Sequence, residues 1–413
     1  MDIINLAISS QTALFLISIS FLLTFLIPKS LRSLFIVVVI IKITVITISS
    51  LLASYSPSGV ILPGNVDQFW YIGMAEVTAQ EINKDGFFVD YADVLGVYYP
   101  KYLLYHYILG WLAFSKGDNL FTYRLFNMFT SLLIVIYGVK IAQTLYGKNN
   151  LLYQKYVIIG LGLLPSTNMY TLMVMRDVLI TLLVTMFIYH LIKWQIIPLI
   201  LTLGLTYLTR WHLVMIMGTV SAGWSLIGSR LLSSKKSGIK IWQTVLIAGI
   251  LAITGYAMTY VVPSLAFMRN YVTNTSLLLN FGMAFPISFL GLDFAFTDAS
   301  NLAISRTRLL LGRLIAPETI ILPFLMFLLI TRKSSVTITS LHKKLQIVFW
   351  LSILVYTFAY YTNFGFLTIR ALSPFYPYMY LLVLPLIVTG VQKLPRFLGL
   401  HTKPTLQYGH TIK

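Results

Sequence analysis

The chain has 413 residues, of which 58% are hydrophobic and only 10% are charged, and its mean hydropathy is +0.83. Soluble globular domains have about 25% charged residues, so this composition excludes them and indicates an integral membrane protein. The net charge of +18 alone is typical of nucleic-acid binding, but no basic segment is free of apolar stretches, so no nucleic-acid partner is expected. The absence of cysteine excludes disulfides and thiolate metal sites.

Apolar stretches near the length of about 20 residues that a helix needs to cross a bilayer recur along the sequence. They predict an all-α, polytopic transmembrane helix bundle of about eleven spans. We expect one integral module over 1–393 and a short cytoplasmic tail over 394–413, with the first span retained rather than cleaved. The predicted spans are 8–28, 34–54, 122–145, 156–174, 176–193, 196–210, 212–229, 241–263, 312–331, 346–362 and 374–392.

Charge sets the expected orientation of the bundle. Basic residues follow every second span, in segments without carboxylates, and cytoplasmic loops have this bias. The N-terminus is therefore predicted outside and the C-terminus inside, with all twelve carboxylates at the outer face and the basic belt on anionic membrane lipids. We expect a multi-pass membrane protein whose outer face carries the carboxylates and hence any chemistry.

Two predicted outer segments, 55–121 and 263–311, are too long to be connectors. Each contains a short apolar stretch, 101–115 and 276–292, that predicts a helix lying at the membrane interface. We expect the two segments to pack together as a roof above one cavity. Seven of the twelve carboxylates fall in the first segment: Asp67, Glu76, Glu81, Asp85, Asp90, Asp93 and Asp118.

The arginines are distributed unlike the lysines. Eight of the twelve lie at or near the predicted outer face, whereas the inner loops use mostly lysine. A guanidinium grips two phosphate oxygens at once, so the set indicates an anionic lipid headgroup as ligand. The alternative for any one arginine is a structural pairing with Asp177, Asp293, Asp298 or Glu318. The eight are Arg124, Arg176, Arg210, Arg269, Arg306, Arg308, Arg313 and Arg370.

Short motifs follow one another along the chain: 64–71 with Ala75, Tyr99–Pro100 before 101–115 and Gly117, 124–127, 140–147, 164–166 before Arg176–Asp177, and 370–374 with Pro377. In this succession the chain resembles the GT-C superfamily of integral-membrane glycosyltransferases, including the bacterial protein-mannosyltransferases and aminoarabinose transferases. It departs from them at Gln68, where relatives often have Glu, and at Tyr98–Tyr99, where they have a His-Pro run. The chain also lacks the soluble outer C-terminal domain of some members, so a protein acceptor is not expected.

The resemblance implies transfer of a sugar from a polyprenyl-phosphate donor to a glycan or lipid-linked acceptor. Asp67 would be the base in a single, inverting displacement, for which one carboxylate suffices. Arg370, Arg124 and Arg176 would bind the donor phosphate. The alternative for Asp67 is a hydrated turn residue after Pro63.

Further acidic residues are weaker candidates. Glu76, Asp90 and Asp93 could bind the acceptor or supply a second acid, although hydrated surface carboxylates look the same in sequence. No pair of histidines has metal-ligand spacing, so no metal site or cofactor is predicted, and a divalent cation has no support in the sequence.

Two other functions fit the same predicted topology. A Wzy-like O-antigen or capsule polymerase would share the outer arginines and use pyrophosphate-linked lipids, but such proteins usually have their large outer loops in the C-terminal half. A transporter of a lipid-linked substrate predicts carboxylates inside spans and repeat symmetry. The predicted spans contain almost no carboxylates, and Lys42 is the clearest charge within one of them. The transporter is therefore the third choice.

Overall fold

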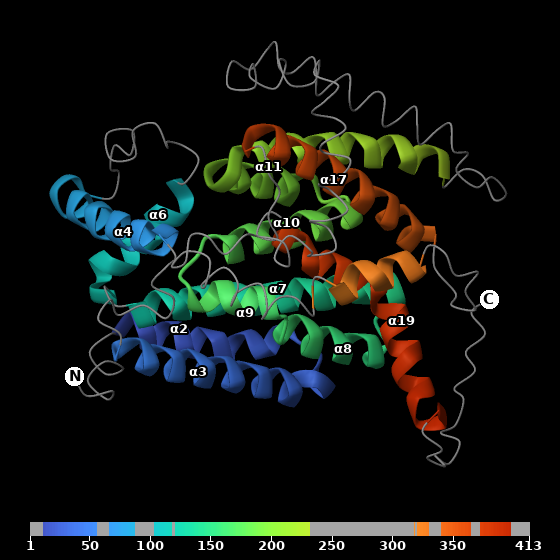
Figure 1. Ribbon diagram of the computed structural model, residues 1–413, viewed down its shortest axis with the longest axis horizontal. Coiled ribbons are helices and arrows are strands. Elements are labelled where there is room, and N and C mark those ends of the chain that lie inside the picture. Colours follow the sequence, from blue (N-terminus) through green and yellow to red (C-terminus); the bar gives the residue numbers. More distant parts are fainter. Residues whose placement is uncertain are drawn as a thin grey trace, which may run out of the picture.

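The protein was analysed as a computed structural model that describes residues 11–55, 66–86, 103–117, 120–231, 318, 320–329, 340–364 and 372–397 (Figure 1). Every regular element in these ranges is helical and none is a strand, which confirms the predicted all-α class for this part of the chain. The predicted span 241–263 and the outer segment 263–311 lie outside the described residues.

The first half of the described chain forms ten elements. They are α2 (Gln11–Leu22), η1 (Leu23–Leu26), η2 (Lys29–Leu31), α3 (Arg32–Ser54), α4 (Val66–Asp85), α6 (Leu103–Leu112), the π-helical turn η4 (Ala113–Gly117), α7 (Leu120–Tyr146), α8 (Leu151–Gly162) and α9 (Pro165–Leu172). The remainder comprises α10 (Asp177–Lys193), α11 (Ile196–Leu231), a helix over Ile320–Leu329, α17 (Ser340–Phe364), η6 (Ser373–Phe375) and α19 (Tyr376–Phe397).

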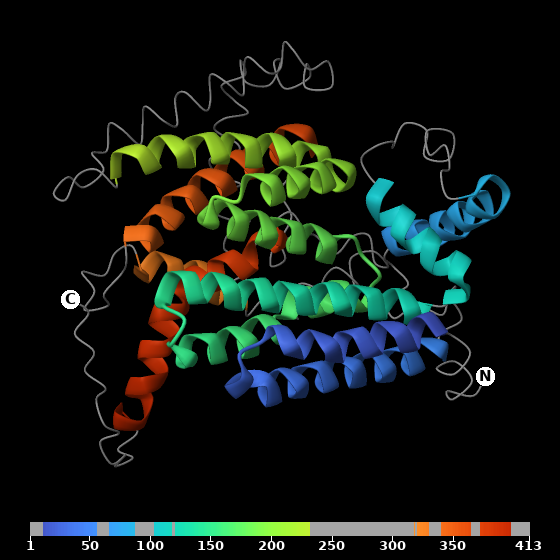
Figure 2. The ribbon, with the colours of Figure 1, turned by 180° about the vertical axis from the view of Figure 1, so that it is seen from behind.

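Most of these helices lie side by side along the longest axis of the molecule (Figures 1 and 2). Helix α7 is central, because it contacts α2, α3, α8, α9, α10 and α19 and buries side chains around its whole circumference. Helices α4 and α6 pack against each other at one end of the bundle, and α19 runs obliquely near the other end (Figure 1). Helix α4, which contains Asp67, Glu76, Glu81 and Asp85, is thus held at one end of the bundle.

Three helices are long and apolar enough to cross a membrane by length and composition: Lys29–Ser54, Leu120–Tyr146 and Ser373–Gln392. On α3 the side facing the bundle buries Phe35, Val39 and Ile46, while Val37 and Ile48 on the other side are about half exposed. A helix that is apolar all round is stable only where lipid or protein covers it. The protein is therefore membrane-associated through such helices.

The structure breaks the stretch predicted as one helix over 156–174. Helix α8 ends at Gly162, and α9 begins at Pro165, whose ring has no N–H to donate and is favoured in a first helical turn. The prediction of a continuous helix is wrong because Leu164 adopts an extended ψ of 118° before that proline. In Figure 1 the junction of α8 and α9 lies partway along α7.

A second break separates α9 from α10. Val174 has a φ of 51°, a left-handed conformation that a β-branched side chain adopts only at a cost of about 1–3 kcal/mol. The side chain of Val174 is fully buried, so the break lies within the protein rather than at its surface. Exposed backbone groups are not tolerated in lipid, and the break therefore needs protein partners.

A third break falls within α11 at Arg210, whose φ of −157° and ψ of 82° interrupt the helical dihedral angles. The two parts on either side correspond to the predicted helices 196–210 and 212–229. Helix α10 ends as predicted at Lys193, where Trp194 adopts a left-handed cap and its N–H donates to the Leu191 carbonyl at 3.2 Å.

Candidate functional site

Helix α4 presents one face to α6. Its buried side chains recur every three or four residues, at Gln68, Tyr71, Ala75, Thr78 and Ile82, which is the spacing of one helix face. Helix α6 approaches this face of α4 closely at Gly110. A Cβ atom added to that glycine would lie 2.2 Å from Thr78 Cγ2. The two helices therefore form one unit, and α4 is fixed in rotation about its axis.

Asp67, the predicted base, lies in the first turn of α4, directly before Gln68. The structure describes its backbone but not its side chain. Glu76 is exposed on α4, off the face that packs on α6. Asp90 and Asp93 lie outside the described residues, so their grouping with Asp67 stays a prediction.

Aromatic side chains join α4 to α6. The Trp70 ring lies edge-on to the His106 ring with 4.6 Å between centroids, and the Tyr71 ring lies edge-on to the Tyr105 ring at 5.2 Å. Burial lowers the pKa of His106 to about 3, and the positive charge of Arg176 acts in the same direction. His106 is therefore neutral at physiological pH, and Arg176 lies close enough to act on it electrostatically.

Helix α6 is in turn bonded to the bundle through α7. The Tyr105 hydroxyl and the Asn127 side-chain oxygen lie 3.3 Å apart, and Asn127 Nδ2 donates to the Met175 carbonyl at 3.3 Å. Burial raises the pKa of Tyr105 well above its ordinary value, and among smaller contributions the charge of buried Asp177 acts in the same sense. One polar network thus links α4, α6, α7 and the break between α9 and α10.

Arg124 is buried at the start of α7 with 1% exposure. Its Nε donates to the Leu172 carbonyl at 2.9 Å, and its Nη1 donates to the Ser50 hydroxyl at 2.9 Å. Leu172 is the last residue of α9, whose terminal carbonyls have no partner within the helix. Arg124 therefore stabilises the α9–α10 break, while its Nη2 makes no hydrogen bond within the described chain.

Arg176 repeats this arrangement at the third break. Its Nη1 donates to the Thr209 carbonyl at 3.0 Å, directly before the non-helical Arg210. A guanidinium at a helix C-terminus also complements the negative end of the helix dipole. Two of the three arginines predicted to bind a donor phosphate thus bind helix ends, while Arg370 lies outside the described residues.

Sequence reasoning missed Asn127 and Tyr105 as members of this network. Asn127 follows Arg124 by three residues, so both lie on one face of α7, and an amide on an otherwise apolar span is a detectable signal. The Asn127 amide donates to the Met175 backbone carbonyl, in the break between α9 and α10, and no residue type identifies such an acceptor. Within the described ranges, no three His, Cys, Asp or Glu residues are grouped as metal ligands.

Two further ionisable side chains are buried beside the α8–α9 break. Glu318 accepts hydrogen bonds from the Ser166 backbone N–H at 2.8 Å and from the Ser166 hydroxyl at 2.7 Å. Lys42 donates to the side-chain oxygen of Asn168. A carboxylate and an ammonium therefore both bind the first turn of α9, inside the bundle.

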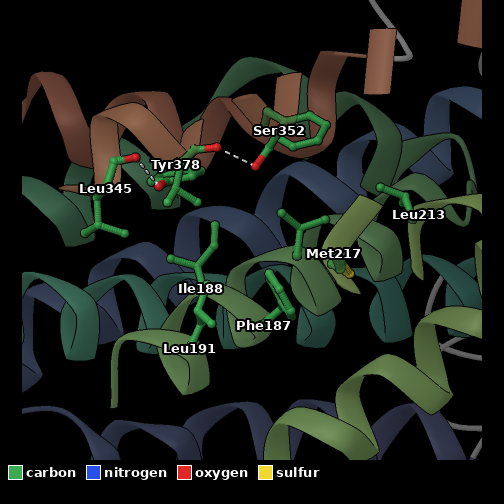
Figure 3. A pocket seen from close by; sticks show the side chains of 11 residues that line it. Phe187, Ile188, Leu191, Leu213, Met217, Leu345, Ser352 and Tyr378 are labelled. Atoms are coloured by element: carbon green, nitrogen blue, oxygen red, sulfur yellow. Dashed lines mark hydrogen bonds between the residues drawn. The ribbon is translucent and has the colours of Figure 1, made fainter. Parts of the chain in front are cut away.

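An apolar cavity of about 20 Å³ lies away from α4, between α10, α11, α17 and the start of α19 (Figure 3). Phe187, Leu213 and Met217 are among its lining residues, and the Tyr378 hydroxyl beside it donates to the Leu345 carbonyl. A space of this size holds about one water molecule and no sugar or prenyl unit. It is a packing defect and not a substrate site.

Comparisons with family models, with curated proteins and with solved structures gave no match. The candidate site therefore rests on the geometry of this chain alone.

Proposed function

We propose that the protein is a multi-pass membrane glycosyltransferase of the GT-C type. It would move a sugar from a polyprenyl-phosphate donor to a glycan or lipid-linked acceptor at the outer face of a bacterial inner membrane. The observation in its favour is the joining of the Asp67-bearing helix, through α6, to the bundle end at which Arg124 and Arg176 are buried. A carboxylate and fixed guanidinium groups on elements joined at one end of the bundle would suit removal of a proton from an acceptor hydroxyl and stabilisation of a departing phosphate.

In the proposed mechanism Asp67 accepts the proton of the acceptor hydroxyl as that oxygen attacks the anomeric carbon. The bond from that carbon to the phosphate oxygen breaks, and the configuration inverts. Arg370 would contact the phosphate, while the buried guanidinium groups of Arg124 and Arg176, held by their hydrogen bonds, would act on its charge from within the bundle. A site fixed before the substrate binds loses little energy to reorganisation during the reaction.

The basic residues support the proposed orientation. Tyr146 at the end of α7 bonds both His342 Nδ1, at 3.1 Å, and the Leu381 carbonyl, at 2.8 Å, so the start of α17 lies at the end of the bundle where α7 finishes. The nearby Lys148 and Lys343 are exposed there, opposite α4, as a cytoplasmic belt requires.

The deciding experiment offers the purified protein, in lipid nanodiscs, a panel of polyprenyl-phosphate sugars and, separately, pyrophosphate-linked repeat units. Turnover of a monophosphate-linked sugar with inversion is the expected result. Turnover of only the pyrophosphate-linked units would favour a polysaccharide polymerase instead.

A transporter of a lipid-linked substrate is the second candidate, and one observation favours it. Glu318 and Lys42 are two ionisable groups buried beside a helix break inside the bundle, and such groups commonly mark transport pathways. Flux of a lipid-linked sugar across proteoliposomes without any transfer product would support this candidate over the transferase.

A further inference from the structure

The side-chain amide of Gln68 is the least satisfied polar group on α4. Gln68 has 0% exposure, and neither its Oε1 nor its Nε2 has a hydrogen-bond partner in the described part of the chain. Buried amides in native proteins are nearly always paired, so an unpaired one calls for a specific explanation. The residue also lies in the first turn of α4, directly after Asp67, where the backbone N–H groups of a helix lack internal partners.

Thr78, on the same face of α4, provides a contrast. Its hydroxyl is also buried without a partner in the described chain, but its methyl group packs where Gly110 leaves room for it. Packing therefore accounts for Thr78. Gln68 has two unpaired polar atoms, and a methionine would fill the same volume without them.

The chemistry of the amide limits the ligand that would satisfy it. Nε2 only donates hydrogen bonds and Oε1 only accepts them. A phosphate oxygen pairs with Nε2 but leaves Oε1 unpaired, whereas sugar hydroxyls both donate and accept. A sugar therefore complements Gln68 better than a phosphate does.

The surroundings of Gln68 suit a sugar attached to a lipid phosphate. Trp70 and Tyr71 follow it on α4 and contact His106, which lies within the electrostatic reach of Arg176. The beginning of α4, with Gln68 and Trp70, is therefore linked through His106 to the end of the bundle where Arg176 is buried.

We propose that Gln68 recognises the donor sugar by hydrogen bonds to its hydroxyls. This sugar site lies next to Asp67 and is separate from the phosphate site. This inference rests on the proposed function, because it requires a sugar-bearing lipid as ligand. It assigns sugar recognition to a side chain that makes no contribution to the folded protein through hydrogen bonds of its own.

The test measures the affinity of the full-length protein in nanodiscs for polyprenyl phosphate and for polyprenyl-phosphate hexose and pentose. The wild type is expected to bind at least one sugar-bearing lipid about 10- to 100-fold more tightly than the bare lipid, as two added hydrogen bonds allow. The Gln68→Met variant should lose this preference, bind bare polyprenyl phosphate as the wild type does, and melt at the same or a higher temperature. Removal of an unpaired buried amide does not destabilise a fold.

Thr78→Val is the matched control, because it removes the other unpaired group of the same helix face. It should keep the sugar preference and the melting temperature. A Gln68→Met protein that melts lower than the wild type, or that still prefers the sugar-bearing lipid, would overturn the proposal. So would a wild type without any preference.

Failure of the proposed function gives a different pattern. A wild type that prefers the sugar-bearing lipid but never transfers the sugar refutes the transferase and leaves the role of Gln68 intact. Transfer by a Gln68→Met variant with wild-type discrimination refutes the role of Gln68 and leaves the transferase intact.

Discussion

The two ends of the bundle use positive charge in different ways. At the α4 end, Arg124 and Arg176 are buried and donate to the last carbonyls of broken helices. At the other end, Lys148 and Lys343 are exposed, so their ammonium groups are free to bind nearby anions. A buried guanidinium must be paired, whereas an exposed ammonium need not be. The two arginines are therefore part of the fold, and the two lysines anchor the protein to anionic lipid headgroups. Substitutions should therefore have unequal effects at the two ends.

The largest effect is expected at Asp67. The Asp67→Asn variant should lower the rate of sugar transfer roughly 10²- to 10⁴-fold while it remains folded, because the amide keeps the shape of the side chain but cannot accept the proton. Glu81→Gln is the control, since Glu81 pairs only with exposed Lys84 among the described residues, at 2.8 Å. Turnover near that of the wild type in Asp67→Asn would make Asp67 a hydrated helix-start residue.

The next largest effect concerns stability. Arg124→Leu leaves the Leu172 carbonyl and the Ser50 hydroxyl without their donor, and we expect a loss of about 2–4 kcal/mol in the free energy of unfolding. Denaturant titration of the protein in detergent micelles measures it. A variant as stable as the wild type would show that the α9–α10 break holds without the guanidinium.

Both ends contain a buried histidine, so both should be sensitive to acid. Burial lowers the pKa of His106 to about 3 and that of His342 to about 4. The unfolded chain binds these protons near pH 6.5, so stability should fall as the pH drops from 6.5 towards 4, by about 2 kcal/mol per histidine at pH 5. Unfolding measured across this range in the wild type and in His106→Gln should show a shallower slope in the variant, and an unchanged slope would count against a buried neutral His106.

A smaller effect is expected from Arg370→Lys. An ammonium cannot make the two parallel hydrogen bonds of a guanidinium, so the affinity for a polyprenyl-phosphate donor should fall about tenfold. Arg396→Lys, in the last turn of α19, is the control at the basic end. Equal donor affinity in both variants would place Arg370 among ordinary lipid-facing arginines.

The smallest effects should occur among the lysines of the basic end. Lys343→Gln should change stability by less than about 0.5 kcal/mol, because this side chain is exposed. Lys344→Gln should cost slightly more, about 0.5–1 kcal/mol, because its ammonium lies 4.0 Å from the centre of the Trp224 ring. Thermal unfolding of the two neighbours side by side separates anchoring from packing, and a larger loss from Lys343→Gln would reverse the assignment.

The sequence predicted long helices and two of the three breaks between them. Long apolar stretches such as those of α3, α7 and α19 are recognisable because the bilayer requires a minimum length of apolar chain. The first break, before Pro165, fell within the span predicted over 156–174. The predicted boundary between 196–210 and 212–229 matches the third break, and the boundary between 156–174 and 176–193 matches the second break at Val174. The side chains that bind the carbonyls of the second break, Arg124 and Asn127, are far from it in sequence and were not predicted as its partners.

The candidate site divides in the same way. The acidic character of the segment around Asp67 and the basic residues of α7 could be read directly from the chain. The linking network of Tyr105, Asn127 and His106 could not, because it depends on the rotation of α4 against α6. The burial of Gln68 likewise depends on the rotation of α4 against α6. In the sequence, Gln68 stands out only as a position where GT-C relatives often have Glu.

The partners of Arg124 have a consequence for the synthesis of the protein. The ribosome produces Ser50 before Arg124, but the Leu172 carbonyl emerges only 48 residues later. As a predicted membrane span, α7 would enter the bilayer during that interval with an arginine whose acceptor carbonyl does not yet exist. Arg124 lies near the start of the helix, where its long side chain can reach the lipid headgroups until the Leu172 carbonyl has been made. Moved to the middle of α7, the same contact would hinder insertion of the helix before it could help the finished fold.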